Sequence, residues 1–180
     1  SLLHENPTSV EEDLEALSQC EAQIRNRCIV EHIARECGLA LAGFRTNDAL
    51  EMYYDIKQGR HDLGFISKGW EDPGFRIGDL VEVGWWDRDI VQANSHHIMR
   101  FCATNGIGLE IQEAPITISL QLDGVLYSEG FNRDTFLKTL ESLNVCVEKI
   151  HTLIPEGRPG RNSSAGIICG TLTEFSSRAH

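Results

Sequence analysis

The first part of the chain has the hydrophobic pattern of a long amphipathic helix. From Val10 onward, apolar residues recur every three or four positions, and polar or charged residues fill the positions between them. Ser9 and Glu12 have the spacing of a capping box, and Gly38 supplies a stop signal. The pattern predicts a helix over residues 10–37. A helix this long must lie across an extended neighbouring structure.

From Leu39 to Trp86 the period of the hydrophobic pattern falls to two, which is typical of strands. Short turn-forming sequences interrupt the pattern, and turns this short join antiparallel neighbours. We therefore expect three or four antiparallel strands. The last of them includes Trp85 and Trp86, so the two indole rings would point to opposite faces of the sheet.

The second half of the chain changes again between helical and strand patterns. An apolar stripe predicts a helix over residues 88–105, and alternating runs predict strands at 109–113 and 116–122. The pair Asp123-Gly124 has the composition of a hairpin turn. A third amphipathic helix is predicted over residues 134–154, closed by a proline.

These elements predict an α+β fold with the order helix, strands, helix, strands, helix. We expect one domain over residues 1–155, built on an antiparallel sheet of about five strands. The first and third helices would cover one face, and the second helix would be free to form a subunit interface. Residues 156–180 are rich in Gly, Pro and Ser and are interpreted as a C-terminal extension, with one small late strand at 167–169.

The composition excludes several classes of function. The 180 residues carry a formal net charge of −11, which argues against binding to nucleic acid or to an anionic membrane surface. No apolar run has the length of a membrane span, and the first residues lack the pattern of a signal peptide. None of the six cysteines belongs to a Cys-x-x-Cys pair, so we expect reduced thiols in a cytoplasmic protein.

Few residues have the spacing that catalytic or metal chemistry requires. Cys28, His32 and Glu36 lie four residues apart on the first helix and could present three ligands to a metal, but the sequence nominates no fourth. His97 and Cys102 are five residues apart, which is awkward for a nucleophile and its base on one helix. Acidic pairs lie at turns and helix starts, where capping explains them. We predict no catalytic residue, no metal and no cofactor.

The tryptophans and nearby large side chains are the strongest candidates for a binding surface. An indole ring supplies a large apolar area together with one polar N–H, which suits contacts between proteins. The alternative to partner binding is that these side chains are buried within the fold, with helices covering one face of the strands and a loop covering the other. We assign partner binding to Met52, Tyr54, Trp70, Trp85 and Trp86.

The second half also carries a recognisable series of elements. They are an asparagine on the inner face of the second helix (Asn94), the run 116–122 followed by Asp123-Gly124, the Tyr-Ser-Glu-Gly sequence at 127–130, and the helix 135–154 closed by Pro155. This series resembles the fold shared by type III secretion chaperones and the YbjN family of bacterial regulators. The resemblance covers residues 14–155 as a pattern of elements. The long first helix, the paired tryptophans and the chain after Pro155 depart from it.

The resemblance implies a non-enzymatic protein that binds other proteins. Secretion chaperones are small, acidic, cytosolic homodimers that hold a segment of a client protein in extended form. The net charge of −11 independently suits basic or amphipathic client segments. By the same resemblance, the second helix contributes to a homodimer interface, for which we name Ile90, Asn94, His97 and Phe101.

Two other interpretations stay open at this point. One is a small enzyme or ligand-binding protein with a pocket between sheet and helix, lined by Trp85 or Trp86, His97 and Cys102. Such a protein would have a closed cavity that holds a strongly perturbed acid, His or Cys. The other is a domain of a longer polypeptide, which would leave an apolar patch where its neighbour belongs.

Overall fold

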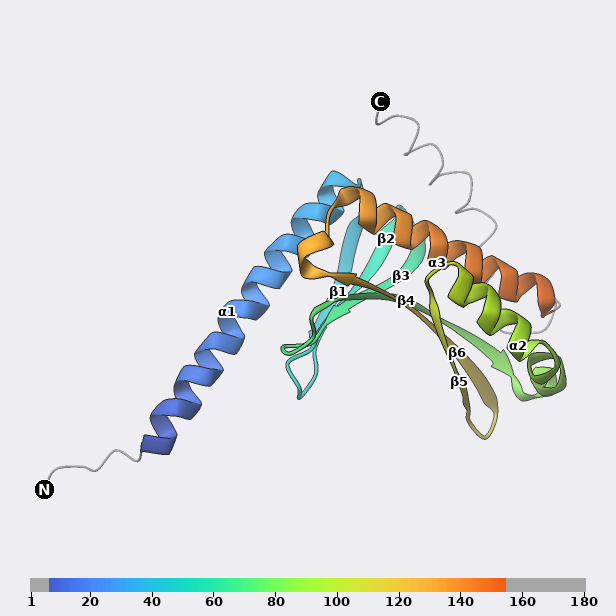
Figure 1. The fold of residues 1–180 in the computed structure, drawn as a ribbon, viewed down its shortest axis with the longest axis horizontal. Coiled ribbons are helices and arrows are strands. Elements are labelled where there is room, and N and C mark those ends of the chain that lie inside the picture. Colours follow the sequence, from blue (N-terminus) through green and yellow to red (C-terminus); the bar gives the residue numbers. More distant parts are fainter. Residues whose placement is uncertain (1–6, 155–180) are drawn as a thin grey trace, which may run out of the picture.

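The computed structural model describes residues 7–154 as three α-helices and a six-stranded sheet (Figure 1). The predicted α+β class is confirmed, and so is the order of helix, four strands, helix, two strands, helix. The elements are α1 (Pro7–Glu36), β1 (Ala40–Thr46), β2 (Met52–Gln58), β3 (His61–Lys68), β4 (Gly74–Gly84), α2 (Arg88–Thr104), β5 (Gly108–Glu113), β6 (Thr117–Tyr127) and α3 (Arg133–Leu153).

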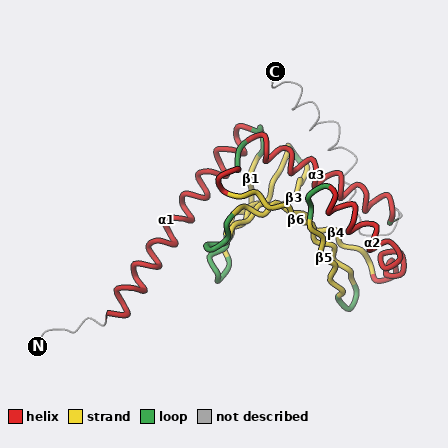
Figure 2. Tube along the Cα trace, viewed as in Figure 1, coloured by secondary structure: helices red, strands yellow, loops and turns green. Residues whose placement is uncertain are grey.

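The sheet is antiparallel throughout, with the strand order β1-β2-β3-β4-β6-β5. β4 and β6 pair along their whole length, from Gly74 opposite Tyr127 to Gly84 opposite Thr117. They are the fourth and fifth strands in this order, and α2 and β5 are the connection between them in sequence. The sheet is strongly curved, and both α2 and α3 lie on its convex side (Figures 1 and 2).

Helix α2 is therefore not free, contrary to the prediction. Its side chains Val91, Ile98 and Cys102 are buried, because the helix packs against α3 and β5. It is α1 that leaves the body of the molecule: its N-terminal half extends away from the sheet, and its buried side chains begin only at Val30 (Figure 1).

The ends of the helices follow ordinary capping rules. α1 begins at Pro7, a residue that suits a first helical position because no N–H is needed there, so Ser9 lies inside the helix and not at its cap. Gly38 ends α1 with a φ of 68°, and the N–H of Leu39 returns to the carbonyl of Ala34 at 2.9 Å. Asn132 caps α3 by accepting from two backbone N–H groups.

The core fills the space between the convex side of the sheet and the two helices. Phe131 stacks on Phe75 of β4 with ring centroids 4.4 Å apart, and it meets Phe136 of α3 edge-on at 5.5 Å. Burial of one such side chain stabilises the fold by about 1.5–3 kcal/mol. The largest fully buried side chains are Met52, Ile56, Ile66, Phe75, Ile77, Ile98, Ile118, Leu120, Leu122, Phe136, Leu143 and Ile150.

Two local predictions were wrong. The strand ends at Gly84, and Trp85 and Trp86 begin a short 3₁₀ turn that leads into α2. Asp123-Gly124 lies in the middle of β6 and is not a hairpin turn. The glycine serves helix packing instead, because a Cβ at position 124 would lie 2.7 Å from Cγ2 of Thr139 on α3.

The predicted extension at 156–180 and its small strand at 167–169 lie outside the described residues. Within residues 7–154, no helix is both long enough and apolar enough to cross a membrane.

Candidate functional site

The concave side of the sheet carries no helix among the described elements (Figure 1). Along β2 the alternation is clear: Met52, Tyr54 and Ile56 are buried beneath the helices, and the residues between them are partly exposed on the other side. We call this second side the open face. The strand register places on it Arg45, Tyr53, Asp55, Phe65, Ser67, Arg76, Leu80, Glu82, Gln121 and Asp123.

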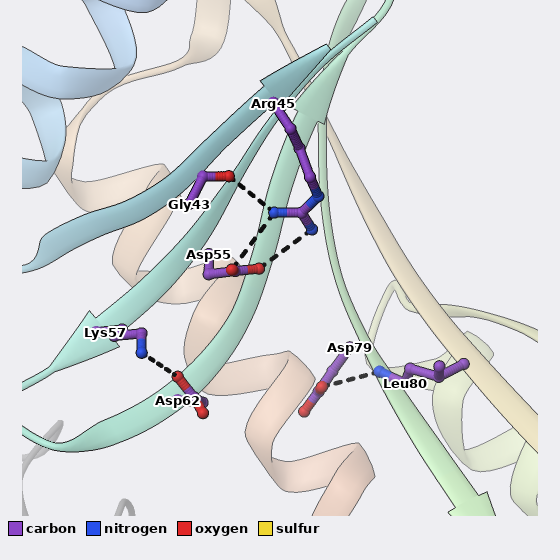
Figure 3. Close-up of polar contacts among 7 residues, drawn as sticks. All are labelled: Gly43, Arg45, Asp55, Lys57, Asp62, Asp79 and Leu80. Atoms are coloured by element: carbon purple, nitrogen blue, oxygen red, sulfur yellow. Dashed lines mark hydrogen bonds and ion pairs between the residues drawn. The ribbon is translucent and has the colours of Figure 1, made fainter. Parts of the chain in front are cut away.

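Charges of both signs alternate across the open face. Arg45 of β1 reaches both oxygens of Asp55 on β2, at 3.2 and 3.4 Å, and also donates to the carbonyl of Gly43 (Figure 3). These side chains are about half exposed, so their ion pair contributes at most about 1 kcal/mol to stability. Burial raises the pKa of Asp123, and the positive charge of Arg76 opposes the rise.

Aromatic rings lie between the charges. The ring of Phe65 lies across β4 at Gly78, where a Cβ would be 2.6 Å from its Cζ. Tyr53 lies beside it, with the ring centroids 6.5 Å apart. Burial and a hydrogen bond to Glu51 raise the pKa of Tyr53 to about 12, so its hydroxyl stays protonated. The centre of the open face thus offers an apolar strip bordered by charges, which suits a peptide better than a small polar ligand.

The sheet is incomplete beside this strip. β3 pairs with β4 only at Phe65–Gly78, Ile66–Ile77 and Ser67–Arg76, and then the two strands separate. β4 continues to Gly84 with β6 on one side, and no strand within residues 7–154 pairs with its other side from Asp79 onward. We call this stretch of β4 the open edge. An unpaired edge presents backbone donors and acceptors to any extended chain.

The direction of the backbone groups follows from two hydrogen bonds. Trp85 donates its N–H to the carbonyl of Ile116 at 3.2 Å, so position 85 faces the β6 side. Because successive residues alternate, the N–H groups of Leu80 and Glu82 face the open edge. The N–H of Leu80 donates to a side chain, Oδ1 of Asp79, at 2.8 Å (Figure 3). This is consistent with an N–H that does not face β6.

Asp79 is the most perturbed carboxyl group near the open edge. It faces the helical side of β4, and burial raises its pKa from 3.8 to about 6. The hydrogen bond from Leu80 opposes this rise, and the nearby charge of Asp62 adds to it. Asp79 therefore satisfies one backbone donor of the open edge when no other strand does so.

Trp85 and Trp86 lie at the end of the open edge. Their side chains are 39% and 57% exposed, so both are on the surface. The guanidinium of Arg88 lies 4.6 Å from the ring centroid of Trp85. The ring of Trp86 folds over Gly84, where a Cβ would be only 2.3 Å from Cζ2.

The other three residues assigned to partner binding lie elsewhere. Met52 and Tyr54 are almost fully buried, and the hydroxyl of Tyr54 donates to Glu31 and accepts from Arg27 of α1. Trp70 lines a narrow crevice between α1 and the ends of β2 and β3. The structure thus joins the two adjacent tryptophans to the open edge but separates them from these three side chains.

The residues named for a dimer interface form a strip along one flank of α2. Ile90 and Phe101 are partly buried against the core, and Lys149 of α3 lies 5.3 Å from the ring centroid of Phe101. Asn94 donates to the carbonyl of Ile90 within the helix at 2.9 Å. Only His97 is exposed, so this strip offers little free apolar surface to a second subunit.

The residues suggested for an enzymatic pocket do not converge. His97 is exposed on α2, whereas Cys102 is fully buried and faces Cys146 of α3. The hydrogen bond with Cys102, and then burial, raise the pKa of Cys146, which makes its thiol a poor nucleophile.

The candidate metal ligands on α1 do not form a site either. His32 pairs with Glu36 at 3.5 Å, and Cys28 is exposed on the same helix. Within residues 7–154, no group of three or more His, Cys, Asp or Glu side chains is placed to hold a metal ion.

Sequence reasoning missed the open edge entirely. The strands there read as an uninterrupted set joined by short turns, and nothing in the hydrophobic alternation marks where two strands stop pairing. One weak signal was present in Asp79, a carboxylate in the inward-facing series of β4 that includes Ile77 and Val81. A charge at an inward position is a known feature of unpaired strand edges.

The chain was compared with protein families, curated proteins and solved structures. No family model matches it, and no curated protein matches it. Among solved structures it is similar to an uncharacterized protein from Methanothermobacter thermautotrophicus, with a TM-score of 0.57. The match covers 69% of this chain and 93% of that chain at 10% sequence identity. At this identity the likeness shows a shared fold alone.

Proposed function

We propose that this protein is a non-enzymatic, cytoplasmic binding module that captures an extended segment of a partner protein. The observation that carries the proposal is the open edge of β4, from Asp79 to Gly84. A partner segment would add there as a further strand and form backbone hydrogen bonds to Leu80 and Glu82. The proposal agrees with the resemblance to secretion chaperones and YbjN-type regulators, which bind other proteins.

The surroundings of the open edge indicate the composition of the segment. Leu80, which is 48% exposed, and the two tryptophans supply apolar contacts at the edge and at its end. Glu82 and Asp62 are exposed carboxylates on β4 and β3, and the chain as a whole carries a net charge of −11. We therefore expect a segment in which apolar residues alternate with Lys or Arg.

A pair of substitutions at one position tests the mechanism. Glu82→Pro removes the N–H that faces the open edge and leaves the ladder to β6 intact, because position 82 does not bond to β6. Glu82→Ala removes the same carboxylate and keeps the N–H. Random peptides displayed on phage would be selected on the wild-type protein and then measured on both variants by calorimetry.

Strand addition predicts that selected peptides bind the Ala variant within a few-fold of wild type and lose binding to the Pro variant. Thermal unfolding of the Pro variant checks that it still folds. If selected peptides bind Glu82→Pro as well as wild type, or if no peptide is enriched, the proposed function is wrong.

A further inference from the structure

We propose that α1 pairs with α1 of a second copy of this chain as an antiparallel coiled coil. The inference goes beyond segment capture, because it uses a different element and a different partner. It assigns the predicted homodimer to α1 instead of α2, whose apolar residues are largely covered by their own domain.

α1 carries an apolar seam that nothing within residues 7–154 covers. Val10, Leu14, Leu17 and Ile24 are 46–62% exposed, and the N-terminal half of α1 extends from the domain (Figure 1). The spacing between seam positions alternates strictly between four and three residues, which is the heptad pattern of coiled coils. The complete seam is Val10, Leu14, Leu17, Glu21, Ile24 and Cys28.

The seam lies on the side of α1 that faces away from its own domain. The residues that contact the domain or line its crevice include Gln23, Val30 and Ala34. At 100° per residue, the average direction of the seam is about 180° from the direction of these contacts. A second helix can therefore lie along the seam up to Cys28 without displacing α1 from the sheet.

The charges beside the seam select an antiparallel arrangement. The N-terminal half of α1 carries Glu11 and Asp13 beside the seam, and the C-terminal half carries Arg25 and Arg27. In an antiparallel pair centred on residue 19, each Glu11 lies next to Arg25 of the other copy. Arg27, on the other flank of the seam, is held by Tyr54 and Phe44 of its own domain, so the charge complementarity rests on Glu11 and Arg25. All six seam positions then meet an opposite seam position, and the opposed helix dipoles add to the attraction.

The other arrangements lack this complementarity. A parallel pair places Glu21 against its own copy in the centre of the seam and brings no acid next to a base across the interface. Moving the antiparallel pair by one heptad leaves two seam positions of each helix without a counterpart and separates the opposite charges. The antiparallel register centred on residue 19 alone satisfies both the seam and the charges.

The mass of the 180-residue chain in solution gives the first test. Light scattering over a wide concentration series is expected to approach twice the 20.1 kDa of one chain. Arg25→Glu places two acids against each other at both ends of the pair and is expected to return the mass to that of a monomer. Adding Glu11→Arg to the same chain restores the opposite charges and the dimer. Because Glu11 and Arg25 are exposed, these variants keep the fold, which circular dichroism would verify.

His97→Glu is the matched control on α2, since His97 is exposed on the flank named for the alternative interface. The α1 interface predicts that this variant stays a dimer. A dimer that His97→Glu disrupts and Arg25→Glu leaves intact would overturn the proposal, and so would a monomer at every concentration. Glu82→Pro is expected to leave the mass unchanged, so failure of the dimer and failure of segment capture can be told apart.

Chemical cross-linking of two exposed cysteines on α1, Cys20 and Cys28, distinguishes an antiparallel pair of helices from a parallel one. In the proposed pair the two copies of Cys20 lie beside the twofold axis, whereas the two copies of Cys28 are about 27 Å apart along the helices. In a Cys169→Ser background, a short bismaleimide is expected to link Cys28→Ser chains through Cys20 and to leave Cys20→Ser chains unlinked. Linkage through Cys28 would indicate a parallel pair and contradict the proposal.

Discussion

At the scale of a single residue, Asp79 is the carboxyl group that accepts a hydrogen bond from the open edge, and its pKa is raised. Its partly buried carboxylate accepts from the N–H of Leu80, and burial raises its pKa in the folded protein to about 6, above the ordinary 3.8. The folded state therefore binds a proton more tightly than the unfolded chain between these two values. In this window the free energy of unfolding falls as the pH rises, because the ionised carboxylate is costly to bury.

Asp79→Asn removes this pH dependence and keeps an acceptor for Leu80. We expect the variant to be more stable than wild type at pH 7 by about 1–3 kcal/mol, and the difference to vanish near pH 4. Urea unfolding of the wild-type protein and the variant at pH 7 and pH 4 measures this difference in the free energy of unfolding. An offset that is the same at both pH values would show that Asp79 acts through packing and not through its charge.

At the scale of elements, the pairing of β3 with β4 ends at a glycine, opposite Phe65. The ring of Phe65 packs against Gly78 on the open face. A Cβ at position 78 would lie 2.6 Å from Cζ of that ring and 2.6 Å from the carbonyl oxygen of Leu122. Backbone atoms on one side and an aromatic ring on the other leave little room for adjustment. Gly64 of β3 adds to this constraint, because its φ is 120° and a Cβ there would lie 2.3 Å from the carbonyl oxygen of Gly78. The end of the pairing therefore depends on both glycines.

Gly78→Ala is expected to lower the free energy of unfolding by about 1–3 kcal/mol, because the methyl group overpacks this contact. Gly130→Ala is the matched control, since a Cβ at position 130 meets no atom within 4 Å. Chemical denaturation of both variants gives the comparison. Equal stabilities would mean that Phe65 can move aside without cost.

The elements differ in how far the sequence could predict them. The 3.6-residue pattern located all three helices, and alternation located β6. In α2, α3 and β6 the pattern marks a continuous buried face, whereas in α1 it marks mainly the exposed seam. The alternating pattern also extended the predicted strand past Gly84 to Trp85 and Trp86, although the chain turns there. Two residues are too few for the pattern to distinguish a strand from a 3₁₀ turn. The open edge depends on which strands pair, and strand pairing is decided by contacts between residues far apart in sequence. The prediction that α2 is free was wrong for the same reason, because its packing against α3 and β5 is also decided by contacts between residues far apart in sequence.

At the scale of the whole molecule, α1 is held by the buried side chains Val30, Ile33 and Ala34 at its C-terminal end and by polar and aromatic contacts before them. Tyr54 on β2 donates to Glu31 and accepts from Nε of Arg27 at 3.0 Å, while the guanidinium of Arg27 also lies 4.0 Å from the ring centroid of Phe44. These residues link the extended helix to the half of the sheet formed by β1 and β2. They lie between the buried end of α1 and its exposed N-terminal half, so they help to set the direction in which the helix leaves the domain.

Tyr54→Phe keeps the ring and removes both hydrogen bonds. We expect a loss of about 1–3 kcal/mol in the free energy of unfolding, since Arg27 and Glu31 lose a shared partner. Amide hydrogen exchange should become faster around Glu31 while the exchange of β4 and β6 stays close to that of wild type. Uniformly faster exchange would indicate that Tyr54 supports the whole core and not the position of α1.

The separation of β3 from β4 also has a consequence for how the chain folds. β1, β2 and β3 are joined by short turns, so this half of the sheet can form from neighbours in sequence, on the timescale of hairpins. β4 must wait for β6, which follows only after α2 and β5, and closing that longer loop costs more chain entropy. The two halves share only three residue pairs in the sheet, so they are coupled to each other through one short stretch of strand pairing. Refolding should therefore pass through a state in which the first half is protected from exchange and the second half is still open.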